Sequence, residues 1–148
     1  MPDTIYVTQK DVTDACKRLG LSDWANLKDG QIDVAETEKL RQIVGAETLK
    51  VSIKDFQLGL EIELEHGRRF PDANITNNHP VLTAKIVLAH LKESLEYYVR
   101  LDCMELETEI FDAMIAGDIR RLRLKRAALA VRRQDLEARL LASLKRAI

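Results

Sequence analysis

Two short stretches place a histidine and a carboxylate three residues apart, in opposite orders along the chain. The first runs from Glu63 to His66, within Glu-Leu-Glu-His-Gly, and the second runs from His90 to Glu93. On a helix, side chains three positions apart share a face. If the two helices pack antiparallel, His66 comes level with His90 and Glu63 with Glu93. Four polar groups would then meet inside a helix pair.

This set of four predicts either a hydrogen-bond network that fixes the packing or a metal site. Imidazole and carboxylate ligands together suit Zn, Fe or Mn, so the alternative to a protein without cofactor is one that holds a transition-metal ion. Three further side chains would then surround the ligands or join the polar core: Glu61, Glu65 and Tyr97. A di-iron bundle fits less well, because such bundles use two Glu-x-x-His motifs and only one motif here has that order.

No sequence motif for catalysis accompanies these residues. The chain has no Gly-rich phosphate loop and no nucleophile elbow, and neither Cys16 nor Cys103 has a histidine close in sequence. Both cysteines sit in apolar, helix-like contexts, so we expect buried free thiols. We therefore predict a protein that is not an enzyme, with a metal-dependent enzyme or sensor as the alternative.

The elements that position these residues are predicted to be helices. Of the 148 residues, 46% are apolar and only 5% are aromatic, and this composition favours helix over sheet. We predict an all-α fold in three parts. An N-terminal arm with short helices covers 1–50, a helical core covers 51–116, and a basic amphipathic helix covers 117–148.

The predicted core is an antiparallel helix pair. The first helix spans about 53–66, begins at a Ser52 cap and closes at Gly67. The second spans about 80–115, because no glycine or proline interrupts that stretch. Its apolar stripe carries the polar groups in its middle and reads Leu82, Ile86, His90, Glu93, Tyr97, Leu101 and Met104.

A long basic helix over about 118–148 follows. Beyond Gly117, ten basic residues stand against three acidic ones, although the whole chain has a net charge of −1. The helix can fold back on the acidic helix before it, or project and dock on another protein. The residues predicted to bind a partner are Arg120, Arg121, Arg126, Arg133, Leu122, Leu129, Leu136 and Leu140. Nucleic acid is a lesser alternative, because this helix has no aromatic residue for base stacking.

Neither a targeting segment nor a membrane span is evident in the sequence. The N-terminus lacks a basic region followed by an apolar run, and no stretch approaches about 20 consecutive apolar residues. We expect a soluble protein made in the cytoplasm.

The span over about 53–105 resembles a domain family of unknown function that occurs in bacterial and bacteriophage proteins. The family has the motif E-L-E-H-G … A-H-L-x-E-x-x-x-Y-Y. Here it is matched by the segments Phe56–Gly67, Asn74–Asn77, Lys85–Glu93, Tyr97–Tyr98, Arg100–Leu101 and Met104–Glu105. The resemblance implies a compact helical module and brings no activity with it. The basic helix after Gly117 lies outside it.

Together these observations predict a non-enzymatic helical assembly protein. It would associate with itself or with a larger complex through the basic helix and an N-terminal arm over 1–7. The phage connection of the family makes incorporation into a virion a further expectation. The alternative is a metal-binding helical protein built on Glu63, His66, His90 and Glu93.

Overall fold

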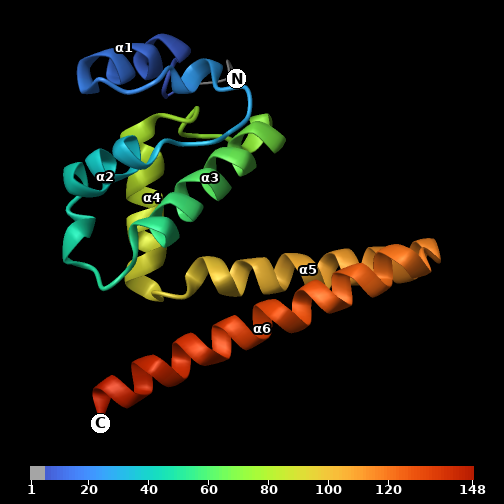
Figure 1. The fold of residues 1–148 in the computed structure, drawn as a ribbon. Coiled ribbons are helices and arrows are strands. Elements are labelled where there is room, and N and C mark those ends of the chain that lie inside the picture. Colours follow the sequence, from blue (N-terminus) through green and yellow to red (C-terminus); the bar gives the residue numbers. More distant parts are fainter. Residues whose placement is uncertain (1–5) are drawn as a thin grey trace. The chain divides into compact units, whose positions relative to one another are not determined.

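The structure, a computed structural model, describes residues 6–148 and confirms the all-α prediction (Figure 1). No strand occurs in that range. The α-helices are α1 (Gln9–Leu19), α2 (Val34–Ile43), α3 (Ile53–Arg69), α4 (Pro80–Glu93), α5 (Tyr97–Ala116) and α6 (Ile119–Ala147). Short 3-10 turns lie at Trp24–Asn26, Ala46–Thr48 and Pro71–Ala73. The chain divides into two compact units, Met1–Leu95 and Glu96–Ile148.

The first unit is built around the crossing of α3 and α4, with α2 packed on both helices (Figure 1). Phe56, Leu60 and Leu64 form a four-residue repeat along α3, and all three are at most 1% exposed. This spacing places them on one face of the helix. The other elements add large buried side chains to the same unit: Val12, Cys16, Trp24, Leu40, Val87 and Leu91.

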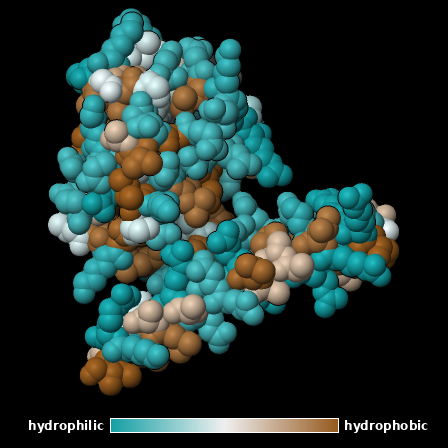
Figure 2. All heavy atoms as spheres, in the orientation of Figure 1, coloured by the Kyte–Doolittle hydropathy of each residue, from teal (hydrophilic) through white to brown (hydrophobic). Residues whose placement is uncertain are grey.

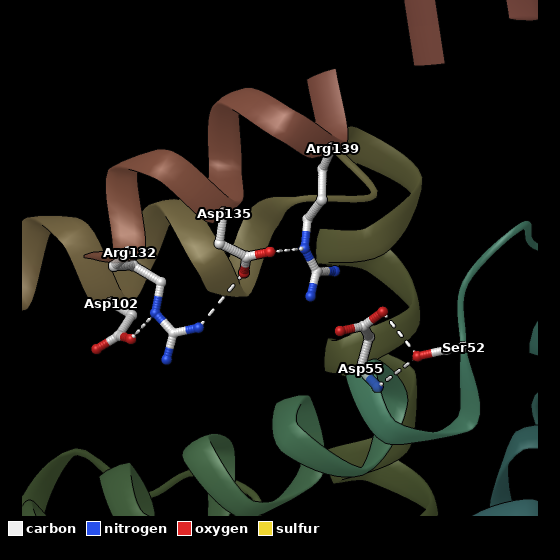
Figure 3. A network of polar contacts seen from close by, with 6 residues as sticks. All are labelled: Ser52, Asp55, Asp102, Arg132, Asp135 and Arg139. Atoms are coloured by element: carbon white, nitrogen blue, oxygen red, sulfur yellow. Dashed lines mark hydrogen bonds and ion pairs between the residues drawn. The ribbon is translucent and has the colours of Figure 1, made fainter. Parts of the chain in front are cut away.

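Side chains cap the starts of α1 and α3, and the cap of α3 is the predicted one. The Thr8 side chain accepts from the Asp11 backbone N–H, while the Asp11 carboxylate accepts from the Thr8 backbone N–H, which is a complete capping box at α1. The Ser52 hydroxyl accepts from the Asp55 N–H at 3.1 Å at the start of α3 (Figure 3). The predicted arm over 1–7 falls mostly outside the described residues, which begin at Tyr6.

The prediction that Gly67 ends the first core helix is wrong, because α3 continues to Arg69. Gly67 is needed there for space. A Cβ at this position would lie 2.2 Å from Asn78 Oδ1 and 2.7 Å from Asn74 Nδ2. The missing side chain therefore lets the loop before α4 pack directly against the backbone of α3.

The prediction of one helix over about 80–115 is also wrong. The helix stops at Glu93, Ser94 adopts an extended conformation (φ −152°, ψ 128°), and α5 begins at Tyr97. Serine is a weak helix former because its hydroxyl competes for nearby backbone groups. The break coincides with the division between the two units, at Leu95 and Glu96.

The second unit is a hairpin of α5 and α6, and it confirms the folded-back arrangement of the basic helix. Gly117 turns the chain in a left-handed conformation (φ 66°), and Asp118 caps α6 through the Arg121 N–H at 2.9 Å. Acidic side chains of α5 meet basic ones of α6. These ion pairs join Glu109 to Lys125, Asp102 to Arg132, and Glu107 to Arg133.

Candidate functional site

A carboxylate flanked by two histidines lies where α3 crosses α4. His90 Nδ1 is 3.2 Å from Glu63 Oε1, and His66 Nδ1 is 4.0 Å from Glu63 Oε2. The Glu63 side chain is only 13% exposed, while the two imidazoles are about one-third exposed. The structure thus brings together three of the four residues predicted for this site.

Glu93, the fourth, does not join them. The buried face of α4 consists of Pro80, Thr83, Ala84, Val87 and Leu91. At 100° per residue, His90 lies at the edge of this face and Glu93 lies well outside it, where it is exposed. The predicted apolar stripe was therefore rotated around the helix.

The predicted set of four metal ligands is accordingly not assembled. In the part of the chain that the structure describes, no three His, Cys, Asp or Glu side chains are grouped to hold a metal ion. Glu63 contacts His90 within hydrogen-bond distance, and His66 lies 4.0 Å from its other oxygen.

Of the three residues predicted to surround the site, Glu61 and Glu65 have separate positions on α3. Glu61 accepts from the Ile32 backbone N–H at 3.1 Å, and Gln57 donates to the Ile32 carbonyl at 2.6 Å, so α3 holds the segment before α2. Glu65 is exposed on α3. Tyr97 belongs to α5, where its ring packs edge-on against Tyr98 at 5.2 Å between centroids.

A recess of about 260 Å³ opens beside Glu63, and we call it the α3–α4 recess. Its polar lining includes Glu63, His66, Asn74, Thr76 and Thr83, and its apolar lining consists of Phe70, Ala73, Ile75 and Ile86, with Gly67 beside them. The sequence indicated the polar groups of α3 but did not show that the loop after α3 would close over them.

That loop is held in one conformation by its own side chains. Asn74 donates to the Gly67 carbonyl at 3.1 Å and to Asn78 Oδ1 at 2.9 Å, and Thr76 donates to Asn74 Oδ1 at 3.2 Å. Asn77 and Asn78 both adopt positive φ, 47° and 61°, which asparagine tolerates better than most residues. The loop therefore forms a fixed rim for the recess.

The remaining titratable groups in apolar surroundings do not extend the site. Burial, followed by the nearby Arg18, lowers the pKa of His79, whose Nδ1 is buried without a hydrogen-bond partner in the described chain. Burial also raises the pKa of both cysteine thiols, Cys16 and Cys103. Both are free and buried, as predicted, and a raised pKa keeps such thiols unreactive.

The leucines predicted to bind a partner lie on the side of α6 that faces α5. Leu129 is buried in the hairpin at 7% exposure, and Leu122 and Leu136 are half-buried. Leu140 is 37% exposed. The face that the sequence suggested for docking is therefore largely occupied within the hairpin.

The predicted arginines divide in the same way. Arg133 binds Glu107 at 2.5 Å. Arg126 and Arg133 also line a recess of about 370 Å³ along the hairpin. Arg120 and Arg121 are exposed at the start of α6.

A network of charged side chains fixes the middle of α6. Arg132 bonds Asp102 of α5 through Nε and lies 3.5 Å from Asp135 through Nη1. Arg139 then donates to Asp135 at 3.0 Å (Figure 3). The Arg132–Asp102 pair joins α6 to α5, and the pairs with Asp135 hold Arg132 and Arg139 along α6.

A second apolar stripe of α6, which the sequence interpretation missed, points away from α5. We call it the outer stripe: Leu124, Ala127, Val131, Ala138 and Leu141. Leu124, Val131 and Leu141 are 61%, 67% and 52% exposed. The spacings of seven and three residues are those of a coiled-coil seam, and this heptad pattern was the available signal.

The other helix of the hairpin also exposes apolar side chains. Met104, Phe111 and Ile115 share a face of α5 at 55%, 61% and 72% exposure. Figure 2 shows apolar residues gathered along α5 and along the C-terminal half of α6 on the side in view. Apolar side chains that are exposed side by side, rather than singly, mark a candidate interaction surface.

Comparisons with known proteins identify a family and no relative. A search of curated proteins and a search of solved structures each found no match. No helix among residues 6–148 is long and apolar enough to cross a membrane. One family profile matches residues 12–107, from α1 into the middle of α5, and leaves α6 outside. The chain therefore belongs to the family described as protein of unknown function (DUF5661).

Proposed function

We propose that this protein is a non-enzymatic helical assembly protein whose α6 pairs with α6 of a second copy through the outer stripe. The observation that carries the proposal is that α6 exposes a heptad-spaced apolar stripe in addition to the one it buries against α5. Helices with such a seam pair with other helices, since pairing removes the stripe from water.

An antiparallel arrangement of the two α6 helices fits the side chains of the stripe best. In antiparallel coiled coils, the two seam positions of one helix alternate with those of the other. Leu124 then lies opposite the partner's Leu141, and Ala127 opposite the partner's Ala138. Leucines meet at both ends of the stripe and alanines meet inside them, while at the centre Val131 lies opposite the partner's Gln134, the one polar residue at a seam position between Leu124 and Leu141.

The charges beside the stripe favour the same direction. Arg123, near the start of α6, and Glu137, near its end, are both exposed at equivalent heptad positions. An antiparallel pair brings each Arg123 near the partner's Glu137, whereas a parallel pair leaves them about 20 Å apart along the axis. Both directions give a closed, two-fold symmetric pair, as in most homodimers, so the side chains rather than the symmetry favour the antiparallel one.

Two parts of the predicted function rest on the sequence alone. Docking through the N-terminal arm concerns residues that the structure mostly does not describe, and incorporation into a virion follows only from the family resemblance. Both stay predictions. The outer stripe of α6 supports the proposed self-association without them.

Substitution within the stripe tests the surface. Val131→Glu places two unpaired carboxylates in the paired seam, which costs several kcal/mol, so we expect dimerisation to weaken by about 100-fold or more. Ile119→Glu is the matched control, because it makes the same kind of change on another exposed β-branched residue of α6, about 120° around the helix from Val131 and five residues before the stripe begins. Sedimentation equilibrium measures both. A monomeric wild-type chain, or equal effects of the two substitutions, would contradict the proposal.

Cysteine cross-linking tests the direction. In a Cys16→Ala, Cys103→Ala background, a mixture of Leu124→Cys and Leu141→Cys chains should form disulfide-linked dimers. Neither chain should cross-link by itself, because each new cysteine lies about 25 Å from its own copy in the antiparallel pair. Cross-linking of each chain with itself would indicate a parallel pair.

The exposed apolar face of α5 is the competing association surface. If Phe111→Glu abolished dimerisation and Val131→Glu did not, the chain would associate through α5 instead of α6.

A further inference from the structure

The α3–α4 recess takes no part in the self-association proposed above. At about 260 Å³ it falls just below the range of about 300–1,000 Å³ that is typical of pockets for drug-sized ligands. A ligand of this size is a small molecule or a single side chain of another protein.

The charge of the lining restricts the ligand further. Glu63 is the acidic group of the recess, and no lysine or arginine is among its lining residues. The guanidinium of Arg69 lies 5.2 Å from the centre of the Phe70 ring and does not line the recess, so an anion would meet the Glu63 carboxylate without a lining cation to balance it. A ligand with positive charge would instead form a charge-assisted hydrogen bond, which is among the stronger contacts that a small ligand can make. A carboxylate has about four acceptor positions on its two oxygens, and the nitrogens of His90 and His66 lie 3.2 and 4.0 Å from the oxygens of Glu63.

The apolar lining indicates that the cation carries a hydrocarbon body. The apolar side chains of the lining are Phe70, Ala73, Ile75 and Ile86. Ile75 is 77% exposed and Phe70 is 48% exposed. Both apolar side chains therefore face water next to the polar groups of the recess. Covering them with an aliphatic chain would remove apolar surface from water at roughly 25 cal/mol per Å².

The recess is formed before any ligand arrives. The Asn74–Asn78 bonds fix the rim, and the absent side chain of Gly67 lets that rim lie against α3. His90 holds one carboxylate oxygen of Glu63 at 3.2 Å. Groups that are already in position lose little conformational entropy on binding.

We propose that the α3–α4 recess binds a small organic cation, an ammonium or guanidinium group on a short aliphatic body. The cationic head lies at the Glu63 carboxylate and the body lies against Phe70, Ile75 and Ile86. The same chemistry is offered by a free alkylamine or alkylguanidine and by a lysine or arginine side chain of a protein. The recess is built from unit 1 alone and does not depend on pairing of α6.

The test uses the full chain and two probes of nearly the same shape, butylguanidinium and butylurea. Titration at pH 8, followed by backbone amide shifts in two-dimensional NMR, should show saturable shifts around residues 63–86 for butylguanidinium. The neutral butylurea should bind at least tenfold more weakly, which corresponds to about 1.4 kcal/mol. Equal binding of the two probes, or no binding of butylguanidinium, would overturn the proposal.

Substitutions identify the carboxylate that binds the cation. Glu63→Gln removes the charge and keeps the shape, so binding of butylguanidinium should fall at least tenfold. Glu65→Gln removes the same charge from the exposed side of α3, and binding should change less than twofold. Ala73→Trp should block the recess while both carboxylates remain. If Glu63→Gln and Glu65→Gln weaken binding equally, the ligand is held by general charge and the site is refuted.

Two more titrations separate the source of the cation and a competing ion. Agmatine represents a free guanidine, and a capped Ala-Arg-Ala peptide represents an arginine within a protein. The probe that binds with the higher affinity identifies the source of the cation. Zn²⁺ is added separately. If it saturates the same amide shifts at stoichiometric concentration and excludes butylguanidinium, the recess is a metal site and the proposal fails.

Discussion

At the scale of single residues, Gly67 determines whether the loop over the recess can form. It has a helical conformation, so alanine in its place would improve helix propensity by about 1 kcal/mol. The added Cβ would, however, lie within 2.2–3.0 Å of Asn78 and Asn74 side-chain atoms. Overpacking of this kind costs about 1–3 kcal/mol and displaces neighbours. Helix propensity therefore favours alanine at position 67, whereas packing of the loop against α3 favours glycine.

We predict that Gly67→Ala lowers the free energy of unfolding by about 1–2 kcal/mol in urea denaturation, because the clash outweighs the gain in helix propensity. Asn78→Gly is a suitable second change, since the positive φ of 61° at that position suits glycine and the closest clashing atom is removed. The double variant should lose less stability than the sum of the two single variants. Additive losses would show that the Gly67 contact is unimportant.

The residue types were enough to predict that a polar cluster forms here, but they did not predict its geometry correctly. The spacing of Glu63 and His66 on one helix and of His90 on another was enough to predict that they meet. Glu93 has the same spacing from His90, but it lies at the last position of α4, away from the buried face. Periodicity places residues around a helix only once the buried face is known, and here the stripe of Leu82 and Ile86 was chosen one position away from Thr83 and Val87.

At the scale of elements, α6 presents one apolar stripe to α5 and another to solvent. Leu129 is 7% exposed and Leu124 is 61% exposed, on the same helix five residues apart. The two side chains are identical, so any difference between the effects of replacing them comes from their surroundings. Replacing Leu129 should lower the stability of the hairpin, and replacing Leu124 should weaken association.

We predict that Leu129→Ala destabilises the hairpin by about 2 kcal/mol or more, because it leaves a cavity in the contact with α5. Leu124→Ala should change the stability of the monomer by less than about 0.5 kcal/mol, while weakening dimerisation. Thermal unfolding at low protein concentration measures the first effect, and its concentration dependence measures the second. Equal losses of monomer stability for the two variants would refute the assignment of inner and outer faces.

The helix boundaries show which elements the sequence encodes locally. Ser52 was identified as a cap from its type and position, and it accepts a backbone N–H at the start of α3, as Thr8 and Asp118 do at the starts of α1 and α6. The break at Ser94 carries no glycine or proline, so local propensity alone does not locate it. Gly67 was predicted to end its helix. The contact that requires a glycine there is made by residues 74–78 of the following loop, and the local sequence around Gly67 does not show it.

At the scale of the whole molecule, the two units divide the proposed tasks between them. The recess is lined by residues of unit 1, and the outer stripe belongs to unit 2. The family match covers unit 1 from Val12 onward and ends at Glu107, within α5. The recess thus lies inside the part shared with the family, whereas α6 lies outside it.

The division can be tested by separating the units. The helices of unit 1 pack on one another through α2, α3 and α4, so we predict that a chain of residues 1–95 unfolds cooperatively and stays monomeric. It should bind butylguanidinium with the affinity of the full chain, since every lining residue of the recess is present. Circular dichroism, sedimentation and the same NMR titration measure these three properties. A fragment that still dimerises would place the association surface in unit 1 and refute the role of α6, while a folded fragment that loses the cation would show that unit 2 completes the recess.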